Sequence, residues 1–477
     1  MPARTHHSLN PQRRQLLKGA LGATGLGVVP WLSGCGSSGG MADATPDAAS
    51  ARGVHVSLGA DTRRERLVTW FTDGLEPSRS VLEFGPALPG QRLDAPMPGF
   101  VEGSASPIFG VDGFTHRAKA SGLDVDLPMR YRVGDGERFS PVRVVPATPA
   151  DGIRFCHFGD NGITDAGRWV RNGVEARQPH FFLVAGDLCY ADGTQPIWDD
   201  WFDQLEPLAA QIPMMSVGGN HEAKDGNGEG WLSRVSHPDP LLPSRGWYRF
   251  DVGRTRFVAS TGGSFVADGR LAEEILFIET TLAQAAVDRL LGRIDFIVFT
   301  MHYTIWTDQA GRSPNNPTLV LLLENILVRY GVDLAAVGHD HIYQRSQRFA
   351  FGFPNPLGYI QVTAGAGGQS MRGFDPISTW SAADHTRFSF VEYEISGERM
   401  TTTTFAVDTE DNSDAGGALE VIDTFTLERR SLLGVQNAVQ PARDAPTLLA
   451  DIRRIEGHTR LRNSIHSQRS VDSFIRA

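Results

Sequence analysis

The chain has 477 residues, of which 41% are hydrophobic and 21% are charged, and its formal net charge is −10. A chain of this length can bury more than one core, so we expect two folded domains with tails. The acidic balance disfavours nonspecific binding to nucleic acid, which requires a basic surface. Three cysteines are too few for a disulfide scaffold, so apolar cores must supply the stability.

The amino terminus has the pattern of an export signal. Two arginines precede an apolar stretch over residues 16–34, which is too short and too rich in Gly and Ala for a transmembrane helix. Residues 12–18 resemble a twin-arginine export motif, and residues 32–35 resemble a lipoprotein cleavage box. We therefore predict a signal peptide over 1–34, lipidation at Cys35, and an exported protein in the periplasm or at the cell surface. An ordinary secretory signal is the alternative.

The next two segments predict a linker and an all-β unit. Residues 35–51 are rich in Gly, Ser, Ala and Asp, a composition typical of a flexible tether. From residue 52 to residue 147, short strands alternate with turns, as in a β-sandwich. These strands are expected at 66–71, 81–84, 129–133 and 142–145.

Strands alternate with helices over residues 150–427, which predicts an α/β or mixed layered domain. Apolar runs that predict buried strands lie at 153–158, 180–185, 213–217, 294–301 and 332–337. Helical spacing is found around 166–178, 199–211, 271–291 and 318–330. Strand patterns return at 358–364, 388–395, 399–407 and 420–427, so we expect the domain to close with an antiparallel layer.

The remaining residues, 428–477, form an arginine-rich tail. It carries nine arginines against five acidic residues and has no strong hydrophobic period. This pattern predicts a peripheral or partly disordered extension. We expect its basic side chains to be solvated rather than to bind a membrane or nucleic acid.

Five buried runs of the 150–427 segment end in residue types that bind metals. The five motifs are Gly159–Gly162, Gly186–Asp192, Gly219–Glu222, Met301–Tyr303 and Gly338–His341. Each motif alone has an ordinary explanation, such as a turn or a buried histidine, but their joint occurrence does not. Ligands collect beyond the carboxyl ends of strands in open α/β sheets, so five distant segments can converge on one site. Two metal ions about 3.5–4 Å apart in such a site would supply the nucleophile and the charge neutralisation that phosphate-ester hydrolysis needs.

These motifs, in this order, resemble the purple acid phosphatase family of the calcineurin-like metallophosphoesterase superfamily. Further matches lie at Trp201–Leu208, Trp247–Phe250, Val68–Trp70 and Tyr131–Gly136. The resemblance covers about residues 52–427. It implies an α/β (α+β) sandwich of two mixed β-sheets flanked by helices over 150–427, preceded by a fibronectin type III-like all-β domain over 52–147.

The resemblance also implies seven ligands for two metal ions. The first ion would be bound by Asp160, Tyr190 and His341, and the second by Asn220, His302 and His339. Asp187 would bridge both ions, because a carboxylate has two oxygens. A tyrosinate suits iron(III), so iron(III) is expected at the first site. Two imidazoles and an amide suit iron(II), zinc or manganese at the second.

The implied activity is hydrolysis of small-molecule phosphate monoesters by attack of a metal-bridged hydroxide on phosphorus. We expect His221 to bind the phosphoryl group or to protonate the leaving oxygen, and Glu222 to orient His221. A phosphodiesterase or nucleotide hydrolase of the same superfamily is the first alternative, and an inert, lipid-anchored binding module is the second. The alkaline phosphodiesterases that share twin-arginine export carry a Trp-Asp-Asp-His-Glu run, whereas residues 198–201 lack its histidine.

One departure from the family pattern concerns the segment after His302. The family commonly carries a further histidine there, but residues 303–338 contain none. Asp308, Asn315 or Asn316 could take its place. The two cysteines that would remain after signal removal, Cys156 and Cys189, are expected to be small buried core residues.

Overall fold

The computed structural model describes residues 50–238, 245–262, 271–314, 320–408, 419–448, 450–451 and 453–454. The predicted signal peptide, Cys35 and all but the last residues of the predicted tether lie outside these residues, as do Asn315, Asn316 and the chain beyond residue 454. The described residues belong to one compact unit. None of its helices is both long and apolar enough to cross a membrane.

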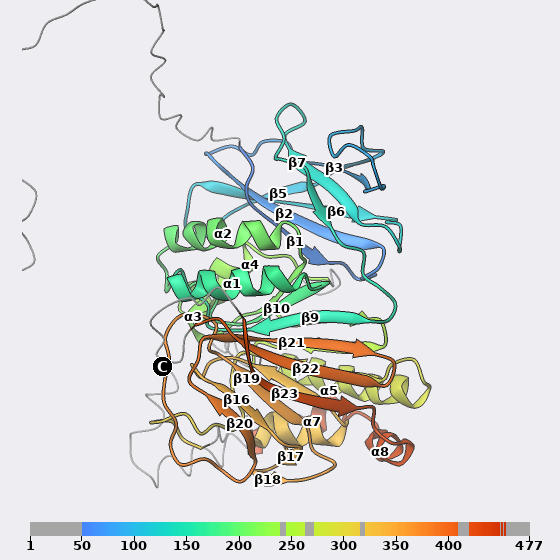
Figure 1. The fold of residues 1–477 in the computed structure, drawn as a ribbon, viewed down its shortest axis with the longest axis vertical. Coiled ribbons are helices and arrows are strands. Elements are labelled where there is room, and N and C mark those ends of the chain that lie inside the picture. The colour runs from blue at the N-terminus through green and yellow to red at the C-terminus, as the bar shows by residue number, and fades with distance from the viewer. Residues whose placement is uncertain are drawn as a thin grey trace, which may run out of the picture. The chain divides into compact units, whose positions relative to one another are not determined.

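Two antiparallel four-stranded sheets form the amino-terminal part of this unit (Figure 1). The first has the order β1-β2-β6-β5 and the second β4-β3-β7-β8. Their bounds are β1 (Arg52–Leu58), β2 (Glu65–Asp73), β3 (Val81–Pro86), β4 (Gly99–Glu102), β5 (Ser104–Pro107), β6 (Gly113–Ser121), β7 (Met129–Gly134) and β8 (Arg143–Val145). Trp70 and Tyr131 fill the shared core. The segment contains strands and no helix, as expected, and its likeness to a fibronectin domain stays a prediction.

Two mixed sheets form the second part, which confirms the predicted fold class. The six-stranded sheet has the order β11-β10-β9-β21-β22-β23, and the seven-stranded sheet β12-β13-β14-β15-β19-β16-β20. The strands of the first are β9 (Ile153–Phe158), β10 (Phe181–Ala185), β11 (Met214–Val217), β21 (Ser389–Ser396), β22 (Arg399–Ala406) and β23 (Glu420–Glu428). Those of the second are β12 (Tyr248–Val252), β13 (Thr255–Ala259), β14 (Phe296–Thr300), β15 (Leu334–Val337), β16 (Tyr343–Ser346), β19 (Ile360–Ala364) and β20 (Ser381–His385). A short hairpin joins β17 (Phe349–Ala350) to β18 (Phe353–Pro354).

Helices cover both outer faces of the paired sheets (Figure 1). On the six-stranded sheet lie α1 (Asp165–Arg177) and α2 (Pro196–Ala209), and on the seven-stranded sheet lie α5 (Leu271–Leu290) and α7 (Asn325–Arg329). Shorter helices are α3 (Asn220–Ala223), α4 (Glu229–Leu232) and α8 (Leu432–Ala438), with a 3-10 turn at Gly226–Gly228 and a π-helical turn at Val320–Glu324. Between the sheets, aromatic rings form the central core: Phe155 stacks on Phe181, and Phe257 packs edge-on against Phe155. Each buried Phe contributes about 1.5–3 kcal/mol.

The strands β12 and β13 are not predicted by the sequence pattern. Arg249, Asp251 and Arg256 interrupt their apolar positions, so no continuous run marks them. In the structure Arg256 is buried because it pairs with Asp251 and with Asp288 of α5, both at 2.7 Å. Pairing makes a charged strand residue compatible with burial.

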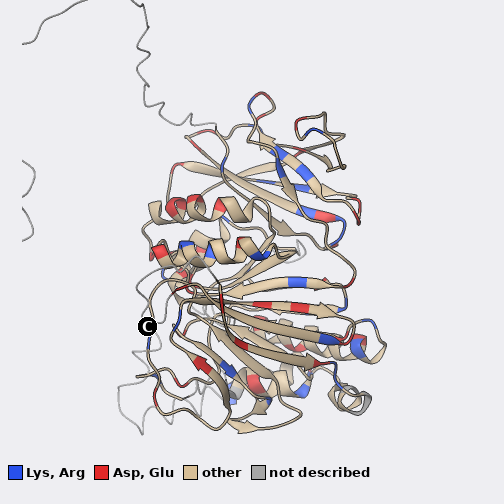
Figure 2. Ribbon diagram, in the orientation of Figure 1, with Lys and Arg blue, Asp and Glu red and all other residues tan. Residues whose placement is uncertain are grey.

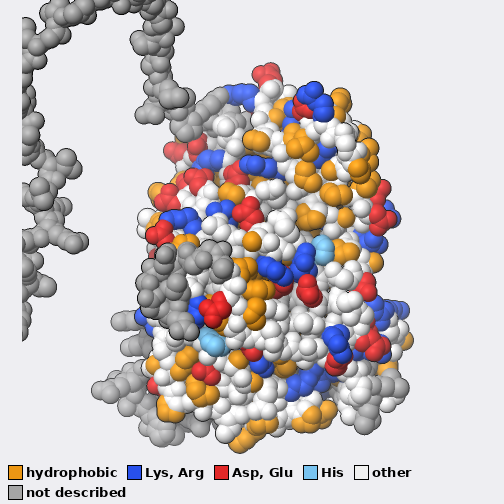
Figure 3. Space-filling view, viewed as in Figure 1, with side chains coloured by type: hydrophobic (Ala, Val, Ile, Leu, Met, Phe, Trp, Pro, Cys, Tyr) orange, Lys and Arg blue, Asp and Glu red, His pale blue; other side chains and the backbone are white. Residues whose placement is uncertain are grey.

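The sandwich docks on α2 through polar contacts. This helix carries four acidic residues and no basic one (Figure 2). Arg52 pairs with its Asp199 at 2.8 Å, and Arg143 donates to its Glu206 at 3.2 Å. The hydroxyl of Tyr131 donates to the Ala210 carbonyl at the end of the same helix, at 2.7 Å. On the face drawn in Figure 3, the described basic and acidic side chains are interspersed, without a continuous basic patch.

The first part of the tail differs from the expected peripheral extension. Ala438 and Leu448 are buried in the core that lies under α5 and α7. Arg430 pairs with the fully buried carboxylate of Asp333 at 2.9 Å, and Arg443 pairs with that of Glu279 at 2.9 Å. A buried carboxylate is costly unless it is paired, so these arginines hold the tail on the domain.

The five metal-type motifs follow strands that end at the same edge of the two sheets. The strands β9, β10 and β11 run parallel in one sheet, and β14 and β15 run parallel in the other. The backbone N–H of Asp160 donates to the Gly186 carbonyl at 3.1 Å, and that of Gly338 donates to the His302 carbonyl at 2.9 Å. Bonds of this kind join the loop after β9 to the loop after β10, and the loop after β14 to the loop after β15.

Candidate metal centre

The loops that follow these strands have a strained backbone. Eight non-glycine residues have a positive φ within the described part of the chain. Five of them lie in the motif loops: Asp160, Asp187, Tyr190, Asp192 and His339. Left-handed backbone costs a non-glycine residue about 1–2 kcal/mol. Such strain persists only where the surrounding structure imposes it, and its concentration here marks a functional site.

Two glycines of the motifs allow close approach between the loops. A Cβ on Gly219 would lie 2.3 Å from Oδ1 of Asp187, and one on Gly186 would lie 2.5 Å from Nδ1 of His302. Both distances are far shorter than a van der Waals contact. These positions therefore accept only glycine if the two side chains are to keep their places.

Three of the predicted ligands form a first donor group. The hydroxyl of Tyr190 lies 3.0 Å from Oδ1 of Asp160 and 3.2 Å from Nε2 of His341. The same nitrogen lies 3.4 Å from Asp160 Oδ1, which closes the triangle. These residues come from the loops after β9 and β10 and from the Gly338–His341 motif. Two oxygens and one imidazole nitrogen thus face a common point.

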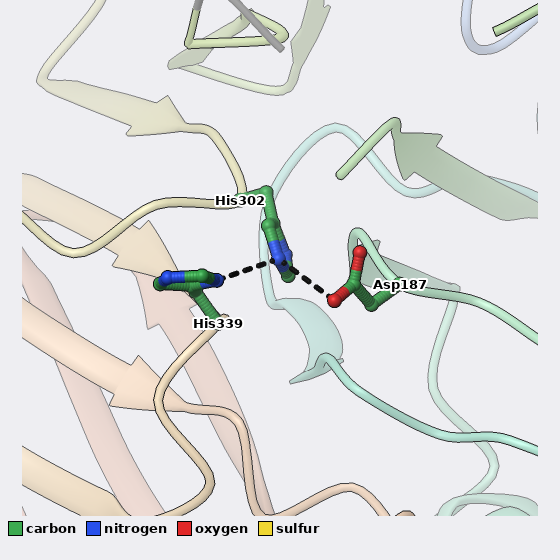
Figure 4. A group of neighbouring side chains, drawn as sticks. All are labelled: Asp187, His302 and His339. Atoms are coloured by element: carbon green, nitrogen blue, oxygen red, sulfur yellow. Dashed lines mark hydrogen bonds and ion pairs between the residues drawn. The ribbon is translucent and has the colours of Figure 1, made fainter. Parts of the chain in front are cut away.

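The other four predicted ligands form a second donor group around His302, and Figure 4 shows three of them, Asp187, His302 and His339. Nε2 of His302 lies 3.1 Å from Oδ2 of Asp187, 3.1 Å from Oδ1 of Asn220 and 3.2 Å from Nδ1 of His339. The two groups are joined because the backbone N–H of His339 donates to Asp160 Oδ2 at 2.7 Å. The structure therefore brings all seven side chains together.

Hydrogen bonds to groups outside the donor groups orient the imidazole rings of His302 and His341. Nδ1 of His302 lies 2.8 Å from the Ala185 carbonyl, which can only accept, so Nδ1 carries a proton and Nε2 is the ring nitrogen that faces the donor group. Nδ1 of His341 lies 2.6 Å from the hydroxyl of Ser370, and its Nε2 faces Tyr190. Metal-ligating histidines are commonly held in this way.

Electrostatics suit a site for cations. Burial would lower the pKa of His302, but the Asp187 carboxylate raises it to about 10, so a proton takes the place of a positive ion. Burial together with the carboxylates of Asp160 and Asp187 raises the pKa of Tyr190 well above its usual value. Only a strongly charged ion could then stabilise its phenolate. Burial, followed by the charges of His302 and Arg312, holds the pKa of His339 well below its usual range, which leaves a neutral ligand.

His221 lies beside both donor groups and faces solvent. Its ring packs 4.2 Å from that of Tyr190, and its Nε2 lies 3.8 Å from Oδ2 of Asp187. Its Nδ1 lies 2.6 Å from Oδ1 of Asp192. Asp192 was not expected from the sequence to act in the site, although it follows Tyr190 by two residues in the same motif. Asp192, and not Glu222, holds the ring of His221.

The expectation that Glu222 orients His221 is wrong. Its carboxylate is 1% exposed and accepts the backbone N–H groups of Asp187, Leu188 and Gly219, each at 2.8 Å. Burial and the nearby Asp187 raise the pKa of Glu222 to about 7, against the opposing effect of these N–H groups. Glu222 therefore ties the loop after β10 to the loop after β11 and does not touch the imidazole.

The carboxylate of Asp308 is not free to replace the further histidine that the family carries after the position of His302. This carboxylate is bound by Nε2 of Gln344 at 2.7 Å and by the hydroxyl of Ser378 at 2.6 Å, so it stabilises the loop. Asn315 and Asn316 lie outside the described residues. Cys156 and Cys189 are buried free thiols in an apolar core, as expected.

Comparison with known proteins agrees with this geometry. Residues 153–343 match the family model described as calcineurin-like phosphoesterase. The chain is 30% identical over 325 residues to purple acid phosphatase 21 of Arabidopsis thaliana, covering 66% of this chain and 71% of that protein. It is 28% identical over 335 residues to purple acid phosphatase 22 of the same plant, with the same coverage of 66% and 71%.

A solved structure shares the fold. The purple acid phosphatase PPD1 from seeds of yellow lupin (Lupinus luteus) superposes with a TM-score of 0.68 at 21% identity. The match covers 83% of this chain and 77% of the lupin chain. Sequence relatives and fold thus agree, and the matched segment contains all five motifs. The chain belongs to the purple acid phosphatase family and is a phosphoric ester hydrolase.

Proposed function

We propose that the protein is an exported phosphatase that hydrolyses small-molecule phosphate monoesters with the help of two metal ions. One observation carries the proposal: two donor groups lie side by side at the strand ends, and a solvent-facing imidazole lies beside both. The donor chemistry fits two different ions, because one group contains a phenol and the other two imidazoles and an amide.

Asp160, Tyr190 and His341 would hold iron(III), and Asn220, His302 and His339 would hold iron(II), zinc or manganese, with Asp187 shared between them. Two such ions neutralise phosphoryl oxygens and lower the pKa of water, so that hydroxide is available at neutral pH. The protein fixes their positions through the strained loops and through Glu222, which holds Asp187 and Gly219 by their backbone N–H groups.

His221 would supply the proton to the leaving oxygen. Its Nδ1 lies 2.6 Å from Oδ1 of Asp192, and this contact orients the ring. The Nε2 atom, 3.8 Å from Oδ2 of Asp187, then remains for the substrate. The backbone N–H of His221 donates to Asp187 Oδ1 at 2.9 Å, which fixes the residue relative to the donor groups.

Metal analysis and a visible spectrum of the purified protein test the centre. We expect iron, and an absorption band from tyrosinate-to-iron(III) charge transfer that disappears in Tyr190→Phe. Hydrolysis of an aryl monoester should exceed that of the matching diester. A colourless, iron-free protein that prefers the diester would contradict the proposal and favour a zinc- or manganese-dependent phosphodiesterase. An inert binding module is disfavoured, because all seven donors are present and converge.

Export and lipidation rest on the sequence of residues 1–35. If the twin-arginine motif directs export, replacing Arg13 and Arg14 by Lys should leave the protein in the cytoplasm. Replacing Cys35 by Ala should release the mature protein from the membrane fraction in soluble form. Unchanged export of the first variant would favour the ordinary secretory route.

A further inference from the structure

A turn in the segment after His302 packs against the second histidine motif. The side-chain oxygen of Gln309 accepts the backbone N–H of His341 at 2.8 Å. The N–H of Ala310 donates to the Gly373 carbonyl at 2.9 Å, and the N–H of Arg312 donates to the Gln309 carbonyl at 3.1 Å. The turn over residues 309–312 is therefore attached to the loop that carries His341.

Asp340 fixes the side chain of Arg312 next to the centre. This aspartate is 1% exposed and stands between His339 and His341 in the sequence. Its Oδ2 accepts the hydroxyl of Thr304 at 2.9 Å. Its Oδ1 lies 3.3 Å from Nε of Arg312, an ion contact without the alignment of a hydrogen bond. A fully buried carboxylate thus holds the guanidinium of Arg312, whose positive charge acts on His339.

The contact at Nε leaves the end of the guanidinium available. Within the described part of the chain, no hydrogen bond or ion pair is recorded for Nη1 or Nη2, and one third of the side chain is exposed. A planar guanidinium presents such atoms as a fork, which matches two oxygens of a phosphate.

We propose that Arg312 binds terminal oxygens of the substrate's phosphoryl group through Nη1 and Nη2, and that Asp340 positions it. The inference deepens the proposed function and rests on it. A monoester dianion offers three terminal oxygens and two negative charges, whereas a diester offers two oxygens and one charge. Arg312 therefore contributes to the preference for monoesters over diesters.

Titration calorimetry of the metal-loaded protein with orthophosphate, together with steady-state kinetics, tests this inference. A charge-assisted hydrogen bond is worth about 1.5–3 kcal/mol, so Arg312→Gln should weaken phosphate binding and raise KM for an aryl monoester about 10- to 100-fold. The kcat should change less than about threefold, and the monoester preference should fall. Arg312→Lys keeps the charge but cannot donate to two oxygens from one planar group. We therefore expect its phosphate affinity to lie between those of the wild type and Arg312→Gln.

Two further variants separate binding from structure. Arg312→Gln combined with Asp340→Asn leaves no unpaired buried carboxylate, and we expect it to keep its metals and its melting temperature but to bind phosphate as weakly as the single variant. Arg372→Gln is the matched control, because Arg372 also lies beside His341 but only its backbone N–H contacts that residue, at 3.0 Å. We expect no change in this control.

The outcomes discriminate between the two proposals. An active wild-type protein whose phosphate affinity is unaltered by Arg312→Gln would overturn this inference alone. A larger effect of Arg372→Gln than of Arg312→Gln would do the same. A wild-type protein that neither binds orthophosphate nor hydrolyses monoesters would overturn the proposed function, and this inference with it.

Discussion

Replacing Glu222 by Gln tests whether this residue holds the metal-site loops together. Its Oε2 accepts the N–H groups of Asp187 and Gly219, and its Oε1 accepts that of Leu188. An amide keeps one oxygen, so at best two of these bonds survive. The Leu188 N–H and the new amide group would then be two buried donors without acceptors. At about 1–3 kcal/mol for each, the unfolding free energy should fall by about 2–6 kcal/mol.

The assay combines denaturant unfolding with metal analysis. Because the freed loops carry Asp187 and Asn220, metal affinity should fall about 10- to 100-fold in Glu222→Gln. Glu324→Gln is the matched control. Its buried carboxylate also accepts several bonds, from Phe351, Trp306 and Tyr359, but it lies away from the donor groups. We expect this control to lose similar stability and to keep its metal affinity.

Two results would refute this interpretation of Glu222. One is a change in unfolding free energy below about 0.5 kcal/mol with unaltered metal content, which would mean that the backbone holds its shape without the carboxylate. The other is normal stability and metal content with a selective loss of turnover for substrates with poor leaving groups. That second result would restore the role beside His221 that the sequence suggested.

The remaining predictions concern the ligands, the acid and the tail. Tyr190→Phe should abolish the visible charge-transfer band while the second ion is retained, as seen by absorption and metal analysis; an unchanged band would exclude Tyr190 as the ligand. Asp192→Asn should lower kcat about 10-fold for an alkyl monoester and less than twofold for a nitrophenyl ester, because only the former leaving group needs a proton from His221. Arg443→Leu should destabilise the protein by about 1.5–3 kcal/mol, measured by thermal unfolding. Burial by itself would raise the pKa of Glu279, but the hydrogen bond from Arg443 lowers it, and the pKa ends below its usual value. This contribution is present above the unfolded-state pKa of Glu279 and is lost as pH falls through the folded-state value, so the difference between wild type and variant should shrink in acid.

The sequence predicted the elements that local patterns encode. Continuous apolar runs predicted β9, β10, β14 and β15, and the 3.6-residue period predicted α1, α2 and α5, within a few residues of their bounds. The strands β12 and β13 were not predicted, because paired charges interrupt their apolar pattern. The tail was expected to be peripheral, since nothing in its own sequence shows that Arg430 and Arg443 meet buried carboxylates more than 90 residues away.

The residue types of the centre followed from motif order, but their partners did not. Seven donor types at strand ends could be named from the sequence, because parallel strands direct the residues that follow them to one edge. The role given to Glu222 was wrong, and Asp192 and Arg312 were overlooked, because hydrogen-bond partners depend on how loops face each other.

The chain's own sequence thus determined which strands and helices form and which residues are chemically able to hold metal ions, since both depend on side-chain type and short-range spacing. Only the tertiary structure decided which nitrogen of each imidazole faces the donor groups, which carboxylate holds His221, and that the guanidinium of Arg312 lies beside Asp340. These depend on distances of about 3 Å between segments far apart in the chain, and no local pattern specifies them.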